Sequence, residues 1–514
     1  MPPTAKPALE RPEADARPQS PARHGVKRNT ALALGTQLTT GAFTAVLTLF
    51  LVRKLEPEGY GVFALALGIA GLVNIPSDLG VSPSAARFIA KRSGDPEAAA
   101  KVLSNALRLK LPIAMAVCGT LFACAGVIAN AYETPELTWP LRGVAIALLG
   151  QNLMLLYGGA FAALRRISVS FRVVLAESAV ECGASIALVL LGAGAVGAGF
   201  GRAIGYIFGA TAAIVLSARV LGRAAVRLRG HDRAETRQLV GYAGALFIID
   251  GAYTLFTKID VLLIGAFLGA TAVGVYQAPL RFTVFLTYMG LAAASGVAPL
   301  LANVGANPAS KETFVAAVRY LVCFQAILIA PLVVWAEPIV SLLLGPGYEG
   351  SAAVLRALTP FIFLAGLAPL VSTTVNYLGE ARRRIPIAFG LILINLVIDL
   401  LLIPRIGIVA GAIGTDVAYL LYVPAHLWVC KVLLGLNLRP VVSALLRALV
   451  ACAAMAATLA AFGTSTLSVS DWFFGGLAGA IVYVATLIGL RAITVTELKD
   501  AVHLVKRRLR RGNA

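Results

Sequence analysis

Apolar stretches long enough to cross a membrane recur along nearly the whole chain, and they limit the fold more than any other feature. A helix needs about 20 residues to cross the roughly 30 Å hydrocarbon layer of a bilayer. Only 13% of the residues are charged, against roughly 25% in soluble domains. The pattern therefore predicts an all-α integral membrane protein with about fourteen transmembrane helices. The predicted spans are 30–52, 60–82, 111–130, 139–164, 173–192, 199–221, 239–266, 272–302, 316–335, 353–377, 386–403, 408–430, 441–463 and 472–493.

The net charge of +19 is distributed unevenly between the two sides of these spans. Lys and Arg collect in the connections after every second span and in the C-terminal tail, whereas opposite connections such as AYETPEL at 131–137 carry few. This asymmetry obeys the positive-inside rule, so we expect both termini in the cytoplasm. It excludes a nucleic-acid partner, which would need a folded basic surface. The basic residues on the predicted cytoplasmic side include Arg87, Lys91, Arg92, Lys101, Arg108, Lys110, Arg165, Arg166, Arg172, Arg223, Arg227, Arg229, Arg233, Arg237, Arg382, Arg383 and Arg384.

Signatures of enzymes and of cofactor sites are missing from the sequence. No GxxxxGK[ST] motif occurs, so nucleotide hydrolysis through a P-loop is excluded. GAGAVG at 192–197 matches a dinucleotide-binding pattern, but it joins two predicted spans, and we interpret it as a turn. The four histidines lack ligand spacing, and the six cysteines fall in apolar spans, where cysteine acts as a small hydrophobe. We expect no metal, no cofactor and, because the connections are short, no enzymatic activity.

Two segments of the chain repeat with similar spacing, which is typical of transporters built from duplicated halves. LEPEGYGVF at 55–63 aligns with LGATAVGVY at 268–276, and GVSPSAA at 80–86 aligns with GVAPLLA at 296–302. Six predicted spans separate the copies, an even number, so both copies have the same orientation. The repeat predicts two parallel six-helix lobes at 30–222 and 239–438. A helix pair at 440–493 is appended, and the tails are 1–29, predicted to be disordered, and 494–514.

Five segments share the motifs of one known family: RKLEPEGYGVFALA, SDLGVSPSAARFIA, TKIDVLLIGAFLGATAVGVYQAPLRF, LLLGPGYEGSAAVLRAL and LLIPRIGIVAGAIGT. Through them the chain resembles, from 30 to 494, the polysaccharide-transport family of Wzx-type oligosaccharide flippases in the MATE-like flippase superfamily. The resemblance implies a bacterial inner-membrane protein that moves a polyprenyl-diphosphate-linked oligosaccharide to the external leaflet by alternating access of two lobes. The cargo would feed exopolysaccharide, capsule or O-antigen of lipopolysaccharide, with a polysaccharide polymerase and export machinery as partners.

Three charged residues lie near the middle of two neighbouring spans. Counted at about 1.5 Å per residue from the turn near 270, Lys258, Asp260 and Arg281 are about 15–18 Å deep. Each charge at that depth costs roughly 2.5–3.5 kcal/mol on insertion scales, so we expect all three to face the protein interior or a water-filled cavity. The excess positive charge suits a diphosphate, and we predict a substrate-binding site. The alternative is a closed Asp260–Arg281 ion pair that holds one helical hairpin together.

Three acidic residues within spans are candidates for ion coupling. Glu177 and Glu181 are four residues apart, so they share a helix face, and two close carboxylates favour the binding of a proton by one of them. The alternative for Glu177 is a solvated position near the cytoplasmic mouth. Asp250 lies eight residues before Lys258, about 80° around the helix, and is a candidate partner for it.

Two other functions remain open from the sequence alone. A drug or small-molecule exporter of the same fold would carry net negative charge in its central cavity if it exported cations, whereas Lys258 and Arg281 favour an anion. A polytopic membrane enzyme of glycan assembly would expose large loops with catalytic groups, and the short connections count against it. The sequence predicts membrane lipids as the surroundings and a lipid-linked oligosaccharide as the cargo.

Overall fold

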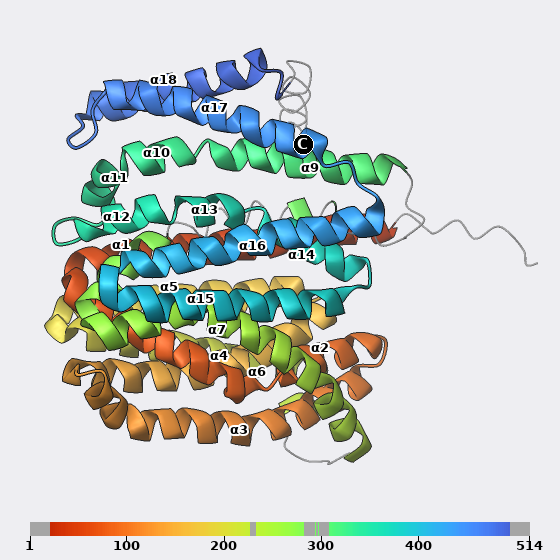
Figure 1. The fold of residues 1–514 in the computed structure, drawn as a ribbon. Helices are drawn as coiled ribbons and strands as arrows, with labels where there is room; N and C mark the ends of the chain where they lie inside the picture. Colours follow the sequence, from red (N-terminus) through yellow and green to blue (C-terminus); the bar gives the residue numbers. More distant parts are fainter. Residues whose placement is uncertain (1–20, 227–232, 282–292, 295–296, 298–307, 494–514) are drawn as a thin grey trace, which may run out of the picture.

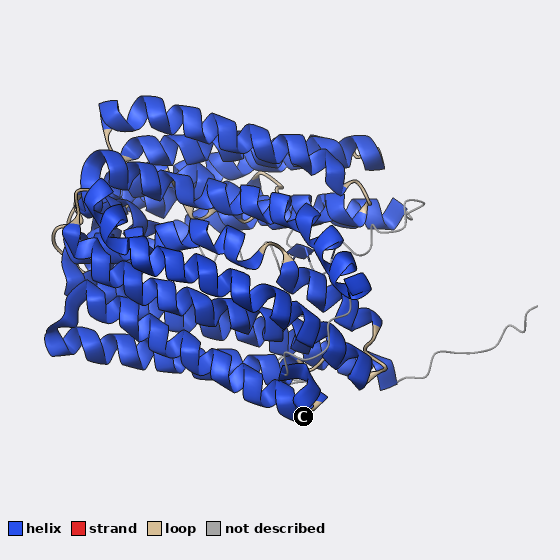
Figure 2. Cartoon of the chain, turned by 90° about the horizontal axis from the view of Figure 1, so that it is seen from below, coloured by secondary structure: helices blue, strands red, loops and turns tan. Residues whose placement is uncertain are grey.

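The computed structural model describes residues 21–226, 233–281, 293–294, 297 and 308–493, and every element in these ranges is helical. The helices lie side by side in a stacked bundle (Figure 1), and a view from below shows the same bundle with no strand in the part drawn (Figure 2). The tail 494–514 lies outside the described residues. So does most of the predicted tail 1–29, since α1 begins at Pro21.

The first half of the described chain, which we call the N-lobe, contains α1 to α6, and the second half, the C-lobe, contains α7 to α16. The N-lobe elements are α1 (Pro21–Asp78), α2 (Val81–Lys91), α3 (Pro96–Ala131), η1 (Pro135–Leu137), α4 (Thr138–Ala163), α5 (Ile167–Leu188), η2 (Val189–Ala193) and α6 (Gly194–Leu221), followed by η3 (Arg223–Val226). The C-lobe elements are α7 (Arg233–Leu280), α9 (Pro308–Ala326), α10 (Ile329–Val334), α11 (Ala336–Leu343), α12 (Gly350–Ala357), α13 (Thr359–Ala365), α14 (Ala368–Tyr377), η6 (Ala381–Arg383), α15 (Arg384–Ile406) and α16 (Val409–Leu434).

Among the described residues, 11 helices are long and apolar enough to cross a membrane. Two of these candidates, at 35–78 and 167–221, have 44 and 55 residues, more than twice the roughly 20 that one crossing needs. Each is interrupted by a residue with non-helical backbone angles, Glu56 in the first and Gly192 in the second. Gly192 lies in the GAGAVG segment, where a turn was predicted. The multi-pass helical class is confirmed, and the number fourteen stays a prediction.

The aligned segments of the internal repeat have matching backbone geometry. Glu56 has φ 57° and ψ 177°, and Gly269, its partner in the alignment, has φ 80° and ψ 177°. The segments that follow these breaks cross each other without side chains between them. A Cβ on Gly61 would collide with the carbonyl oxygen of Ala270, and a Cβ on Gly274 with that of Pro57. The contact is reciprocal, as expected for two lobes related by a two-fold axis. The second aligned pair ends at 296–302, largely outside the described residues.

Two further contacts join the lobes at the end of the bundle that was predicted to be external. The guanidinium of Arg53 donates to the carbonyl oxygens of Leu343, at 3.1 Å, and Leu342, at the end of α11. The hydroxyl of Tyr348 donates to the carbonyl oxygen of Val52 at 3.1 Å. Together with the contact at Gly61 and Gly274, which we call the glycine crossing, they hold the lobes against each other at this end.

The last two described helices, α17 (Arg439–Ala461) and α18 (Val469–Gly489), pack on the C-lobe beside α9 and α10 (Figure 1). The indole N–H of Trp335 donates to carbonyl oxygens of Leu459, at 3.3 Å, and Gly463, at 3.0 Å. The hydroxyl of Tyr483 donates to the carbonyl oxygen of Cys323 at 2.6 Å. Buried polar contacts of this kind attach the appended pair to the C-lobe in one arrangement.

Candidate functional site

Lys258, which was predicted to bind substrate, lies where the lobes meet, and Arg281 is near enough for its charge to act on it. The aliphatic stem of Lys258 on α7 packs against Gly71 of α1, with 2.9 Å between the lysine Cε and a Cβ built on that glycine. Arg281 directly follows α7 and is near enough to repel the ammonium group of Lys258. Neither cation forms an ion pair within the described chain, and the Nε of Arg281 is buried without a hydrogen-bond partner. The site therefore has positive charge that no described acid neutralises.

Asp260 does not pair with Arg281, so the alternative of a closed ion pair is wrong for this structure. Its Oδ2 accepts hydrogen bonds from the hydroxyls of Tyr276, at 2.7 Å, and Thr415, at 2.6 Å. The carboxylate is buried in the C-lobe, on a different side of α7 from the ammonium of Lys258. Direct contact of Asp260 with substrate stays a prediction.

Asp260 belongs to a buried oxygen-rich cluster that the sequence reasoning missed. Asn395 and Asp399, one turn apart on α15, lie against it. Oδ1 of Asp260 and the side-chain polar atoms of Asn395 and Asp399 form no hydrogen bond of standard geometry with described residues, although the three side chains lie close to one another. Gly414 on α16 faces the last two so closely that a Cβ there would collide with them. Two carboxylates, an amide oxygen and a hydroxyl are hard donors, suited to a small cation or to a shared proton.

The sequence contained a signal for only part of this cluster, the part on one helix. Asn395 and Asp399 are polar residues at helical spacing within a strongly apolar span, which alone indicates a functional position. Their partners Asp260, Tyr276 and Thr415 come from other helices, and no spacing in the sequence connects them.

The structure brings Glu177 and Glu181 together on the face of α5 that packs on α6. Small residues allow the approach, because a Cβ on Gly205 or Gly209 would collide with the two glutamates. Glu181 forms an ion pair with Arg202 of α6. Glu177 is only 4% exposed, which contradicts the alternative of a solvated position, and its Oε1 has no hydrogen-bond partner. Their role in ion coupling stays a prediction.

Asp250 lies in α7, but its side chain is outside the part of the structure that is described, so its proposed pairing with Lys258 is not tested. Arg202 was not among the predicted site residues. It sits on α6 over the ring of Tyr206, 4.6 Å from the ring centroid, and its charge also acts on Lys258.

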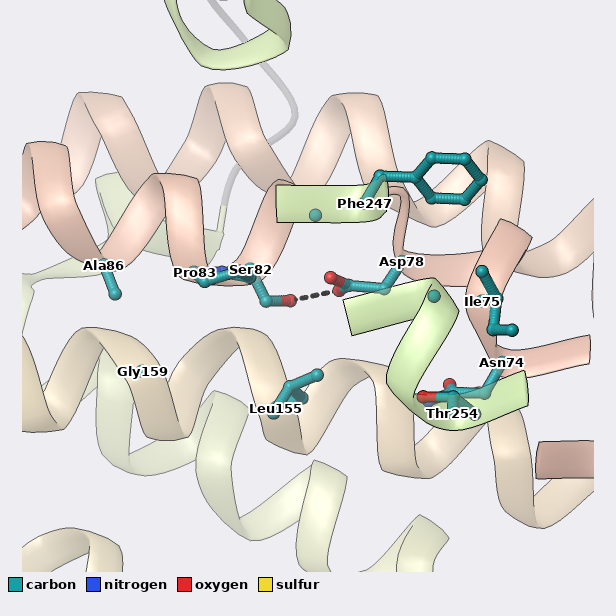
Figure 3. A pocket seen from close by; sticks show the side chains of 12 residues that line it. Asn74, Ile75, Asp78, Ser82, Pro83, Ala86, Leu155, Gly159, Phe247 and Thr254 are labelled. Carbon is teal, nitrogen blue, oxygen red and sulfur yellow. Dashed lines mark hydrogen bonds between the residues drawn. The ribbon is translucent and has the colours of Figure 1, made fainter. Parts of the chain in front are cut away.

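A second buried charge pair lies in the N-lobe. Lys110, counted in the sequence among the basic residues of a cytoplasmic connection, is 1% exposed within α3 and forms an ion pair with Asp78. Its ammonium also donates to Ser82, and Ser82 donates to Asp78, as Figure 3 shows for the last two. This group borders a cavity of about 420 Å³ between α1, α2, α4 and α7. Lys110 is buried rather than in a connection because α3 begins at Pro96, well before the predicted span at 111–130.

Solved structures of membrane transporters share this fold. The lipid II flippase MurJ in an inward closed conformation superposes with a TM-score of 0.69 at 14% identity, covering 90% of this chain and 98% of that chain. An inward-facing multidrug resistance MATE family transporter gives 0.60 at 15% identity, covering 78% and 98%. The probable low-salt glycan biosynthesis flippase Agl15 of Haloferax volcanii is 21% identical over 465 residues, which is 89% of this chain and 94% of that protein.

The chain is a multi-pass helical membrane protein with the fold of these transporters. The profile of MatE matches residues 248–401, within the C-lobe. The chain belongs to the polysaccharide biosynthesis protein family, whose profile matches residues 26–304, more than half of its length. This membership agrees with the resemblance carried by the sequence motifs.

Proposed function

We propose that the protein flips a polyprenyl-diphosphate-linked oligosaccharide across a bacterial inner membrane, with both termini in the cytoplasm. The observation that carries the proposal is the pair of unneutralised cations, Lys258 at the contact between the lobes and Arg281 near it. Both residues are half-buried and lack an acidic partner among the described residues, so the site gains most from an anionic ligand. The family, and a relative named as a glycan biosynthesis flippase, support a lipid-linked glycan as that ligand.

The two lobes alternate in exposing this site. The contacts of Arg53, Tyr348 and the glycine crossing hold the lobes together at the predicted external end, so the diphosphate enters from the cytoplasmic side in the state described. Release to the other leaflet requires those contacts to separate. The protein then acts as a transporter rather than an enzyme, and its cargo passes to a polysaccharide polymerase and export machinery.

We propose that flipping is coupled to an ion gradient through the cluster of Asp260, Asn395 and Asp399. Its unpaired oxygens accept a small cation or a proton. Asp260 is two residues from Lys258 on α7, so a change of charge in the cluster acts on the same helix that holds the substrate. Glu177 and Glu181 are the competing coupling site.

Flipping in proteoliposomes tests the substrate site. We expect Arg281→Ala to lower the rate about 10- to 150-fold, the loss of one charge-assisted hydrogen bond, while Arg281→Lys keeps part of the activity. Arg356→Ala is the matched control, because Arg356 is exposed and its partner Glu337 is exposed too. A normal rate for correctly inserted Arg281→Ala would refute the proposal.

The coupling assignment is tested with the same assay under an imposed sodium or proton gradient. Asp399→Asn should remove the response of the flipping rate to the gradient, and Glu177→Gln should leave it intact. The opposite pattern would move coupling to α5, as the sequence predicted.

One observation favours a second function. The C-lobe contains an aromatic cavity that reaches Asp260, an arrangement that also suits the exporter of an organic cation. Export of ethidium from cells, abolished by Asp260→Asn, would establish that function; Arg384 at the same cavity counts against it.

A further inference from the structure

A large cavity lies inside the C-lobe, and neither Lys258 nor Arg281 lines it. It measures about 690 Å³, between α7, α13, α14, α15 and α16, within the roughly 300–1,000 Å³ of small-molecule sites. Along α7 it extends from Ala252 to Val261, about 14 Å at the helical rise per residue. We call it the C-lobe cavity.

Its walls combine aromatic rings with polar groups. Tyr253, Phe361 and Tyr419 line it, and the last two rings meet edge to face with centroids 4.7 Å apart. The amide of Gln277 and the hydroxyl of Thr373 also line it, and neither has a hydrogen-bond partner in the described chain. Ring faces pack against the C–H faces of sugar rings, and unpaired amides and hydroxyls match sugar hydroxyls.

The C-lobe cavity and Lys258 lie on different faces of α7. Thr257 and Asp260 line the cavity, whereas Lys258, between them in sequence, points across to Gly71 of the N-lobe. Leu280, the last residue of α7, also lines the cavity, and Arg281 is the next residue in the chain. A ligand whose anionic group binds Arg281 therefore begins beside Leu280, at the wall of the cavity.

We propose that the C-lobe cavity holds the oligosaccharide of the lipid-linked substrate while Lys258 and Arg281 hold its diphosphate. This inference rests on the proposed function and adds a glycan-binding subsite to it. The unpaired Gln277 and Thr373 then select for a sugar, because a ligand without hydroxyls leaves them unsatisfied.

Two other occupants fit this cavity less well. An acyl chain would leave Gln277 and Thr373 without partners. An organic cation would meet the positive charge of Arg384, which lines the cavity and donates to Asn376 at 2.9 Å.

The test compares two lipids on the purified full-length protein by equilibrium binding. One is undecaprenyl diphosphate, and the other is the lipid-linked oligosaccharide extracted from the membranes of the source cells. The variant Gln277→Leu with Thr373→Val removes the unpaired polar groups and keeps their approximate size. Thr486→Val on α18 is the control, because its hydroxyl bonds its own helix at Val482 and lies outside the cavity.

The wild-type protein should bind the sugar-bearing lipid about 5- to 150-fold more tightly than the bare lipid, the range for two hydrogen bonds. The double variant should bring that ratio close to one without changing the affinity for undecaprenyl diphosphate, and the control should leave both unchanged. Arg281→Ala should weaken the binding of both lipids.

Equal affinities of the wild-type protein for the two lipids would overturn the inference and leave the proposed function standing. A ratio that the double variant does not change would overturn it as well. Ethidium binding that the double variant abolishes, with the sugar ratio intact, would assign the cavity to organic cations. Failure of undecaprenyl diphosphate to bind the wild-type protein at all would refute the proposed function instead.

Discussion

Gly61 is the position where the smallest change should alter the balance between transport states. A methyl group there would begin well inside van der Waals contact with the backbone of Ala270. Such contact needs about 3.5 Å, so the two segments must part by more than about 1 Å. The obstacle is a backbone oxygen, which has no alternative rotamer. Misfits of this size cost about 1–3 kcal/mol, which corresponds to a shift of about 5- to 150-fold toward states in which the crossing is separated.

Spin labels at two equivalent exposed positions measure this shift. Glu58→Cys in the N-lobe and Thr271→Cys in the C-lobe lie beside the crossing, in a background with the six natural cysteines replaced. Pulsed electron–electron double resonance should show a larger fraction of long distances in Gly61→Ala. Gly119→Ala is the control, since a Cβ on Gly119 meets nothing within 4 Å. An unchanged distance distribution in the folded Gly61→Ala protein would refute the reasoning.

Three further predictions concern a second contact between the lobes, the attachment of the last two helices and the orientation in the membrane. Arg53→Ala should shift the same distance distribution in the same direction by about 2- to 5-fold, the value of a charge at helix-end carbonyls such as that of Leu343, and Arg53→Lys should shift it less. Tyr483→Phe removes a hydrogen bond to a carbonyl oxygen of α9 and should cost about 1 kcal/mol, seen as a lower Tm in detergent with flipping retained; an unchanged Tm would contradict it. Reporter fusions after Arg383 should report the cytoplasm and fusions near Ser468 the outside, and swapped signals would overturn the predicted orientation.

The sequence predicts the features that local composition controls. Apolar length predicted the helical membrane fold, and the aligned glycines of the repeat predicted two lobes whose backbone breaks at Glu56 and Gly269 match. Lys258 and Arg281 were predicted to face the interior because a charge in an apolar span is costly wherever the chain folds, and their role in substrate binding stays a prediction.

Partners across helices were not predictable in the same way. Asp260 and Arg281 have opposite charges at the same depth, yet Asp260 turns to Tyr276 and Thr415 instead. Which face of a helix meets which neighbour depends on the packing of the whole bundle, and one sequence does not report it. Lys110 was misassigned for a related reason, since the helix that buries it extends beyond the apolar stretch.

The glycine crossing has a consequence for genetics. At each side of the contact the obstacle to a larger residue is a backbone oxygen, that of Ala270 or of Pro57. Any residue at the opposite position carries the same oxygen, so no exchange there relieves the collision. Selection for restored export in a Gly61 mutant should therefore return true revertants, or changes that loosen Arg53 and Tyr348, and no compensating side chain at the crossing itself.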